Sequence, residues 1–129
     1  MCKEQKFFVC KHCGNLAGLI NNSGVPIICC GEPMAELIAN TTDAAVEKHV
    51  PVIRLDGNTV NVNVGSTDHP MTAEHHIVWV YLQTEKGGQR KCLCIGGAPN
   101  VTFAITDDDK AVAAFAYCNL HGLWKAEIE

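Results

Sequence analysis

The sequence contains no apolar run long enough to cross a membrane. A transmembrane helix needs about 20 consecutive, mainly apolar residues, and charged or polar residues interrupt every apolar stretch of this chain well before that length. The opening residues MCKEQKFF also lack the apolar segment of a signal peptide. We therefore expect a cytoplasmic protein with no membrane partner.

Positive charge is also scarce. Lys and Arg number 10 against 14 Asp and Glu, so the formal net charge is −4, and the cations are dispersed along the chain. Such a pattern provides no basic patch for nucleic acid, and we expect no nucleic-acid partner. An anionic substrate would have to be attracted by local charge.

The chain has 129 residues, of which 47% are hydrophobic, enough for one ordinary domain or two small ones. Residues 1–38 contain five of the eight cysteines but few large apolar side chains. Segments shorter than about 40 residues usually need a metal or disulfides to fold. We therefore expect a small metal-bound domain at 1–38, a linker at 39–42, and a second domain that extends from residue 39 to residue 129.

The second part of the chain reads as β structure. Val60, Val62 and Val64 alternate with asparagines, as in a strand with one solvated face. Residues 76–82, 111–117 and 124–128 are further strands, and glycine- or aspartate-rich turns separate them. The pattern predicts an antiparallel β-sandwich of about seven short strands, without a convincing helix. The polar loop 65–74 interrupts it and contains histidine, so chemistry is expected there.

The first metal-binding pattern lies in residues 1–38. A C-x-x-C motif is followed by two adjacent cysteines, and the four thiolates suffice for a closed tetrahedral site formed by Cys10, Cys13, Cys29 and Cys30. In a reducing compartment, clustered cysteines are more often metal ligands than disulfides. The residues alone leave a structural zinc site and an iron site both open, because four thiolates bind either metal.

The second pattern lies in the β region, which contains five of the six histidines, His49, His69, His75, His76 and His121. Several of them flank turns or strand ends, and loops at one end of a sandwich can bring such residues together. Cys118 and His121 offer a thiolate and an imidazole from one turn. A mixed nitrogen and sulfur metal site is the natural interpretation.

These motifs carry a family resemblance. Residues 1–38 resemble desulforedoxin, a small rubredoxin-like iron protein whose four cysteines have this arrangement. The second part resembles the superoxide reductases in its His69-Pro70-Met71 segment, His75, and Cys118-x-x-His121, with His49 nearer the start of the domain. A desulforedoxin-like head joined to an immunoglobulin-like superoxide reductase sandwich is the arrangement of the desulfoferrodoxin family.

The resemblance implies a two-iron enzyme that reduces superoxide to hydrogen peroxide without dismutation. One iron would be held by the four cysteines. The second would have four equatorial histidines, an axial thiolate and an open sixth position, its ligands being His49, His69, His75, His121 and Cys118. Electrons would come from an external donor such as rubredoxin, and the protein would be a homodimer.

Two charged residues before His49 are candidates for catalysis. By resemblance, Glu47 closes the sixth position on ferric iron and leaves it on reduction. Lys48 is the one cation next to a proposed ligand, and we expect it to attract superoxide and organise proton delivery. In a regular strand Lys48 would point away from His49, so this role requires irregular backbone there.

Several smaller expectations concern the remaining groups. The amides of Asn119 and Leu120 should donate hydrogen bonds to the Cys118 sulfur. Cys92 and Cys94 share one strand face and are expected to be buried free thiols, with a third metal site or a redox-sensing pair as the alternative.

Two other functions compete with superoxide reduction. Cys-x-x-His on a sandwich also occurs in blue-copper electron carriers, but no methionine follows His121 to serve as the weak axial ligand. A zinc-stabilised interaction module would leave the histidines unexplained.

Overall fold

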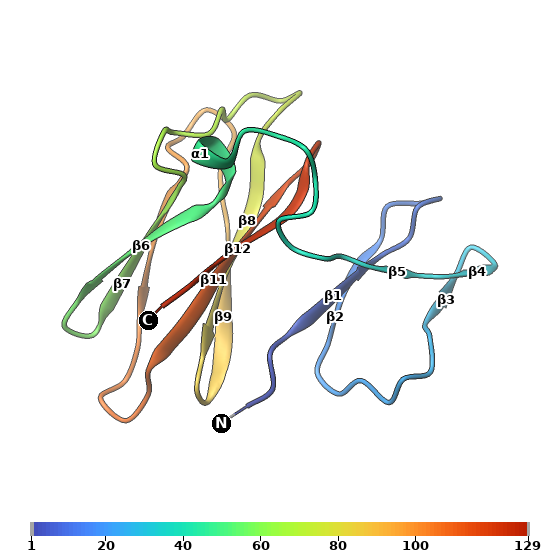
Figure 1. The fold of residues 1–129 in the computed structure, drawn as a ribbon, viewed down its shortest axis with the longest axis horizontal. Coiled ribbons are helices and arrows are strands. Elements are labelled where there is room, and N and C mark those ends of the chain that lie inside the picture. Colours follow the sequence, from blue (N-terminus) through green and yellow to red (C-terminus); the bar gives the residue numbers. More distant parts are fainter. Residues whose placement is uncertain (1, 129) are drawn as a thin grey trace. The chain divides into compact units, whose positions relative to one another are not determined.

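The computed structural model describes residues 2–128, which form two compact units. One unit comprises Lys3–Ile38, and the other comprises Cys2 and the chain from Ala39 onward. Figure 1 shows both as ribbons. No helix among residues 2–128 is both long and apolar enough to cross a membrane.

The first unit consists of short antiparallel strands. β1 lies between β2 and β5 in one sheet, and β3 pairs with β4 in a second; their bounds are Lys6–Val9 (β1), Leu16–Leu19 (β2), Ile28–Cys29 (β3), Glu32–Pro33 (β4) and Ala35–Glu36 (β5). Its buried hydrophobic side chains within the described chain are Phe7, Cys10 and Met34. So small a core stabilises little, because burial of one large apolar side chain contributes only about 1.5–3 kcal/mol. A metal that cross-links the chain would therefore stabilise this unit.

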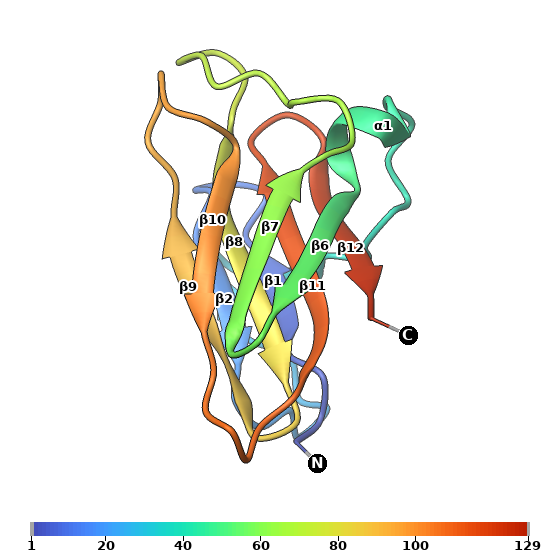
Figure 2. The ribbon, with the colours of Figure 1, turned by 90° about the vertical axis from the view of Figure 1, so that its left-hand side faces the viewer.

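The second unit is an antiparallel β-sandwich. One sheet has the order β10-β7-β6 and the other β12-β11-β8-β9; the strands are Pro51–Asp56 (β6), Thr59–Val64 (β7), Ile77–Thr84 (β8), Gly87–Cys92 (β9), Asn100–Ala104 (β10), Ala111–Cys118 (β11) and Gly122–Glu127 (β12). Figure 2 shows the two sheets face to face. The predicted mainly β fold, with a cysteine-rich site near the N-terminus, is confirmed.

The core fills the space between the two sheets. Val60, Val62 and Val64 of β7 are fully buried, while the asparagines between them face outward, as their alternation predicts. The facing sheet contributes Val80 and Leu82 from β8, and β11 adds further small side chains. This packed block is the rigid support from which the loops at one end project.

The expectation of no helix is wrong at one place. Val46–His49 forms α1, a single helical turn immediately before β6. It contains Glu47, Lys48 and His49. Four residues are too few to show either the alternation of a strand or the apolar stripe of a helix. A turn of this length has no sequence period to detect.

A second expectation, the burial of Cys92 and Cys94, is also wrong. Both thiols are exposed, and the half-buried residue is Leu93 between them. The two faces of β9 are not equally covered, because half-buried and exposed residues alternate over its first four positions. The two-residue alternation is present, but the cysteines occupy the positions whose side chains face solvent.

Candidate metal centres

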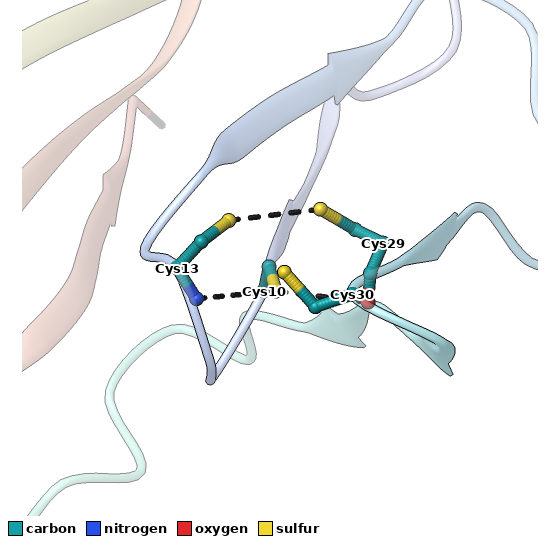
Figure 3. Close-up of side chains that lie close together, drawn as sticks. All are labelled: Cys10, Cys13, Cys29 and Cys30. Atoms are coloured by element: carbon teal, nitrogen blue, oxygen red, sulfur yellow. Dashed lines mark hydrogen bonds between the residues drawn. The ribbon is translucent and has the colours of Figure 1, made fainter.

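The first centre lies in the unit formed by Lys3–Ile38. Cys10 and Cys13 flank the turn after β1, and Cys29 and Cys30 lie at the turn between β3 and β4. Gly31 and Cys30 both have positive φ, which closes this turn tightly and allows adjacent residues to face the same point. Figure 3 shows the four side chains directed toward one another.

The distances between the sulfur atoms suit a tetrahedral metal. All four Sγ atoms lie within 4.8 Å of one another, and Sγ of Cys13 is 3.6 Å from Sγ of Cys29. A metal bound to thiolates at about 2.3 Å requires sulfur atoms about 3.8 Å apart in a tetrahedron. The predicted cysteine cluster is therefore assembled without rearrangement.

Electrostatics at this cluster favours a bound cation. The Cys13 backbone amide, the largest influence, lowers the pKa of Cys10 to about 6. Hydrogen bonding to Cys13 is the main reason that the pKa of Cys30 rises to about 12, and the pKa of Cys29 is raised by the same neighbour. Four thiolates this close repel one another, and a metal ion removes that repulsion by neutralising them.

The second centre lies at one end of the sandwich. There α1, the loop 65–76 and the turn between β11 and β12 come together (Figure 2). These segments carry His49, His69, His75 and the pair Cys118 and His121. The structure thus brings together all five residues that the family resemblance implies as ligands.

The four imidazole rings form a square. Centroids of neighbouring rings are 4.6 Å apart for His49 and His69, 4.5 Å for His69 and His75, 5.0 Å for His75 and His121, and 5.0 Å for His121 and His49. Each neighbouring pair is close to perpendicular, with interplanar angles of 78°–83°. The diagonal pair, His49 and His75, is 6.2 Å apart and tilted by only 33°. Four rings with this symmetry suit four nitrogen ligands of one metal ion.

Hydrogen bonding fixes which ring nitrogens face the centre. His49 Nδ1 donates to the Ala45 carbonyl at 2.7 Å, and His69 Nδ1 donates to the Pro70 carbonyl at 2.7 Å. A neutral imidazole has one N–H, so each Nε2 carries a lone pair. These two Nε2 atoms are nevertheless 3.2 Å apart. Two lone pairs at that distance do not hydrogen-bond to each other, and a shared cation explains their approach.

Burial favours the neutral form of three of these rings. Desolvation is the main cause that lowers the pKa of His69 to about 4, and it also lowers the pKa values of His49 and His75. His75 Nε2 is a buried side-chain atom without a hydrogen-bond partner in residues 2–128. An unpaired buried nitrogen costs about 1–3 kcal/mol, and a metal ion would remove this cost.

The sulfur ligand candidate lies beside the square. Cys118 is fully buried, and its Sγ is 3.8 Å from His121 Nδ1. Ligand atoms of Cys118, His49, His75 and His121 all lie within 4.8 Å of one another. Burial raises the pKa of Cys118, while the backbone amides of Leu120 and His121 oppose this by hydrogen bonding to the sulfur. The expectation that the Asn119 amide also donates to the sulfur is wrong, because this amide donates to the His76 carbonyl at 3.2 Å.

The neighbouring histidines, His75 and His76, are clearly separated by the structure. The His76 ring donates from Nδ1 to the Thr72 carbonyl at 2.9 Å and lies outside the square. Both residues precede β8, which begins at Ile77, and the hydrogen bond to Thr72 holds the His76 ring away from the centre that His75 faces.

Trp124 is a supporting residue that the sequence reading missed. Its ring lies 4.7 Å from that of His49, tilted by 30°, and its indole N–H donates to the His121 carbonyl at 3.1 Å. In the sequence it is one more apolar position of an alternating strand. Only the register of β12 against β11 reveals that it supports two of the histidines.

The charged candidates lie on α1. Glu47 and Lys48 are both exposed, and the charge of Lys48 contributes to the lowered pKa values of His49 and His75. The helical turn supplies the irregular backbone that this arrangement requires. Loop 65–68 is hydrogen-bonded to the helical turn, because Thr67 N–H and the Ser66 hydroxyl donate to the Glu47 carbonyl at 2.9 Å and 3.2 Å.

Comparison with known proteins is consistent with this geometry. The sequence model of the Desulfoferrodoxin family matches residues 41–127. Desulfoferrodoxin of Nitratidesulfovibrio vulgaris is 43% identical over 127 residues, which cover 98% of this chain and 99% of that protein. This chain belongs to the desulfoferrodoxin family.

Solved structures agree with the family assignment. A superoxide reductase from Treponema pallidum superimposes with a TM-score of 0.82 at 44% identity, covering 97% of this chain and 100% of the other. A superoxide reductase from Giardia intestinalis superimposes with a TM-score of 0.54 at 36% identity, covering 64% of this chain and 98% of the other.

The donor sets fit the two iron sites of a desulfoferrodoxin. Four thiolates suit iron at the first centre, and four imidazoles with one thiolate suit it at the second. A blue-copper site is disfavoured, since Met71 is buried and its sulfur accepts the Ile77 amide at 3.4 Å.

Proposed function

We propose that this protein is a superoxide reductase, which transfers one electron to superoxide and yields hydrogen peroxide once two protons are added. The observation that carries the proposal is the square of four imidazoles beside a buried thiol. His49, His69, His75, His121 and Cys118 would hold the iron. Relatives of this chain with the same fold are superoxide reductases.

When bound, ferrous iron supplies the electron and an open coordination position at which superoxide can bind. Cys118 would be the sulfur ligand, and its thiolate would donate electron density toward the metal. The Leu120 and His121 amides hydrogen-bond to its sulfur and stabilise negative charge there. The Ala45 and Pro70 carbonyls orient two imidazoles and keep their Nε2 atoms unprotonated.

Lys48 and Glu47 are proposed to act on the substrate side. Lys48 is exposed on a protein with a net charge of −4, so its ammonium group would attract superoxide and hold the water that delivers a proton. Glu47 would place a carboxylate at the open position in the oxidised state, because hard oxygen ligands prefer the higher charge.

At the first centre, the four cysteines Cys10, Cys13, Cys29 and Cys30 would hold the second iron. We place the domain boundary at residues 38 and 39, so that 1–38 form the four-cysteine domain and 39–129 the catalytic domain. The compact units observed in the structure support this division.

The partners are part of the same proposal. A small rubredoxin-like protein would supply electrons, and the cytoplasm would keep the thiols reduced. Fully exposed Ile20 and largely exposed Val25 in the first unit would be covered in a homodimer. The molar mass measured by light scattering after size-exclusion chromatography would test the dimer independently of activity.

The product yield tests the proposed reaction. Iron-loaded protein should be given a steady flux of superoxide and an excess of reductant, and hydrogen peroxide should be measured. Reduction predicts one peroxide for each superoxide consumed and no release of oxygen. A half-yield of peroxide with oxygen release would show dismutation and contradict the proposal.

A further inference from the structure

Two thiols, Cys92 and Cys94, belong to neither metal centre. Both are exposed, although cysteine is one of the residue types most often buried. Cys92 ends β9, the edge strand of the four-stranded sheet, and Cys94 follows in the connection to β10. Their exposure makes both sulfurs accessible to small solutes.

A guanidinium group contacts the first of these sulfurs. Arg90 Nη1 donates to Cys92 Sγ at 3.1 Å. Within residues 2–128 no carboxylate pairs with Arg90, so its charge is not neutralised by an acid. The thiolate is the nucleophilic form of cysteine, and an adjacent cation favours reaction at that sulfur.

The backbone places the second sulfur on the same side. The Leu93 amide donates to the Val78 carbonyl at 3.2 Å, which extends the pairing of β9 with β8 beyond Cys92. Residues two apart in a strand share a face, and their Cα atoms are about 6.6 Å apart. Disulfides span Cα distances of about 4.4–6.8 Å but also need Cβ atoms about 3.5–4.5 Å apart. Cys94 lies beyond the end of β9, so the backbone after Cys92 has to bend to bring the two Cβ atoms together.

The segment that follows is hydrogen-bonded to the loop of the histidine centre. The Gly96 amide donates to the Met71 carbonyl at 2.7 Å, and Met71 follows His69 and Pro70 directly. The thiol pair therefore lies where β9 passes into the connection that contacts this loop. Peroxide released from the histidine centre would emerge at the same end of the sandwich.

We propose that Cys92 and Cys94 form a dithiol that hydrogen peroxide oxidises to a disulfide. The Cys92 thiolate attacks one peroxide oxygen, the O–O bond breaks, and hydroxide leaves with Cys92 as a sulfenic acid. The Cys94 thiol then attacks that sulfur, the S–S bond forms, and water leaves. One peroxide is reduced by two electrons and two thiols are oxidised. The supply of peroxide rests on the proposed function, whereas the thiol chemistry does not.

Peptide mapping of the full iron-loaded protein tests the pair. Trypsin cleaves after Lys91 and Lys110, and the peptide 92–110 contains Cys92 and Cys94 but no other cysteine. After treatment with hydrogen peroxide and alkylation of free thiols, this peptide should have lost two hydrogen atoms and carry no alkyl group. Untreated protein should give the doubly alkylated peptide. A doubly alkylated peptide after peroxide treatment would overturn the proposal.

Variants identify the roles of the individual groups. In Cys94→Ser, peroxide should leave a sulfenic acid on Cys92 that a dimedone probe captures. Arg90→Gln should slow disulfide formation several-fold, whereas the control Arg54→Gln, which changes an exposed arginine on the other sheet, should not. Equal rates in the Arg90 and Arg54 variants would contradict the role of the guanidinium.

A second arm separates this inference from the proposed function. Superoxide with excess reductant replaces added peroxide, and catalase is included in a parallel sample. Disulfide formed only without catalase supports both proposals. Disulfide formed by added peroxide but not by superoxide turnover supports the thiol chemistry and contradicts peroxide production by the protein.

Discussion

Cys118 is the one sulfur atom among the five donors of the histidine centre, and it is fully buried at the end of β11. Its neighbours offer no replacement, because Met71 is already used by the Ile77 amide. The sulfur ligand proposed for this centre therefore depends on this single residue.

Cys118→Ser should abolish the thiolate-to-iron charge-transfer absorption of the oxidised second centre and most superoxide turnover. The sandwich should still fold, since the change only replaces one buried sulfur by a smaller oxygen in a side chain of the same shape. Absorption spectra and superoxide consumption measure the two effects, and circular dichroism is the control for folding. Retention of both the colour and the turnover would show that Cys118 is not a ligand.

Lys48 affects the substrate and not the metal in this account. Lys48→Ala should lower the bimolecular rate with superoxide by about ten-fold or more, because local positive charge accelerates encounter with an anion. Iron content should be unchanged. The wild-type rate should also fall with ionic strength more steeply than that of the variant, since salt screens exposed charge.

Arg54→Ala is the matched control, because it removes an exposed cation from the outer face of β6. Its rate and salt dependence should follow those of the wild type. Parallel salt slopes and equal rates for wild type and Lys48→Ala would remove Lys48 from the mechanism.

At the scale of elements, α1 packs against loop 65–68, and together they support the histidine centre. A Cβ atom on Gly65 would lie 2.7 Å from the Glu47 carbonyl oxygen and 2.9 Å from that of Val50. Real Cβ contacts do not approach backbone this closely, so the helical turn can pack here only against glycine. This contact positions the turn that carries His49 and Lys48.

Gly65→Ala should therefore displace α1 from the loop and destabilise the second unit by about 1–3 kcal/mol, as overpacking does. Iron affinity at the histidine centre should fall with it, while the four-cysteine centre keeps its iron. Thermal unfolding and metal titration measure these effects. Gly18→Ala is the control, since the added Cβ meets mainly the flexible end of Gln5; equal stability of the two variants would contradict the packing argument.

Elements with a clear period were the ones that the sequence predicted. The strand Thr59–Val64 alternates valine with asparagine, and its burial follows that alternation. The turn Val46–His49 was not predicted, because four residues contain no period, and its conformation depends on Glu47 carbonyl contacts from loop 65–68. The exposure of Cys92 could not be predicted either, since the alternation of Cys92, Leu93 and Cys94 does not by itself show which face of the strand packs toward the core.

The candidate centres show the same limit. Spacing alone indicated the four cysteines, because all lie on two short turns. The histidines are spread from residue 49 to residue 121, and only the family resemblance selected them, including His75 over His76. Trp124 remained hidden, since its contacts with His49 and the His121 carbonyl arise from strand register.

At the scale of the whole molecule, the two metal centres are proposed to be separable. Replacing Cys10 and Cys13 together by Ser should remove one iron per chain and loosen residues 1–38, because that unit has so small a buried core. The sandwich should keep its iron and its thiolate-to-iron absorption. Iron analysis and hydrogen exchange provide the two measurements, and loss of both irons together would show that the chain folds as one domain.

The central claim is that superoxide reacts directly at the iron of the histidine centre. A radiolysis pulse of superoxide should be delivered to the fully reduced, iron-loaded protein while superoxide decay and the ferric thiolate colour are recorded together. The account predicts that superoxide disappears in proportion to protein concentration and that oxidation of the Cys118-ligated iron accounts for the superoxide consumed. Superoxide decay at the rate of buffer alone, with the iron remaining ferrous, would contradict it.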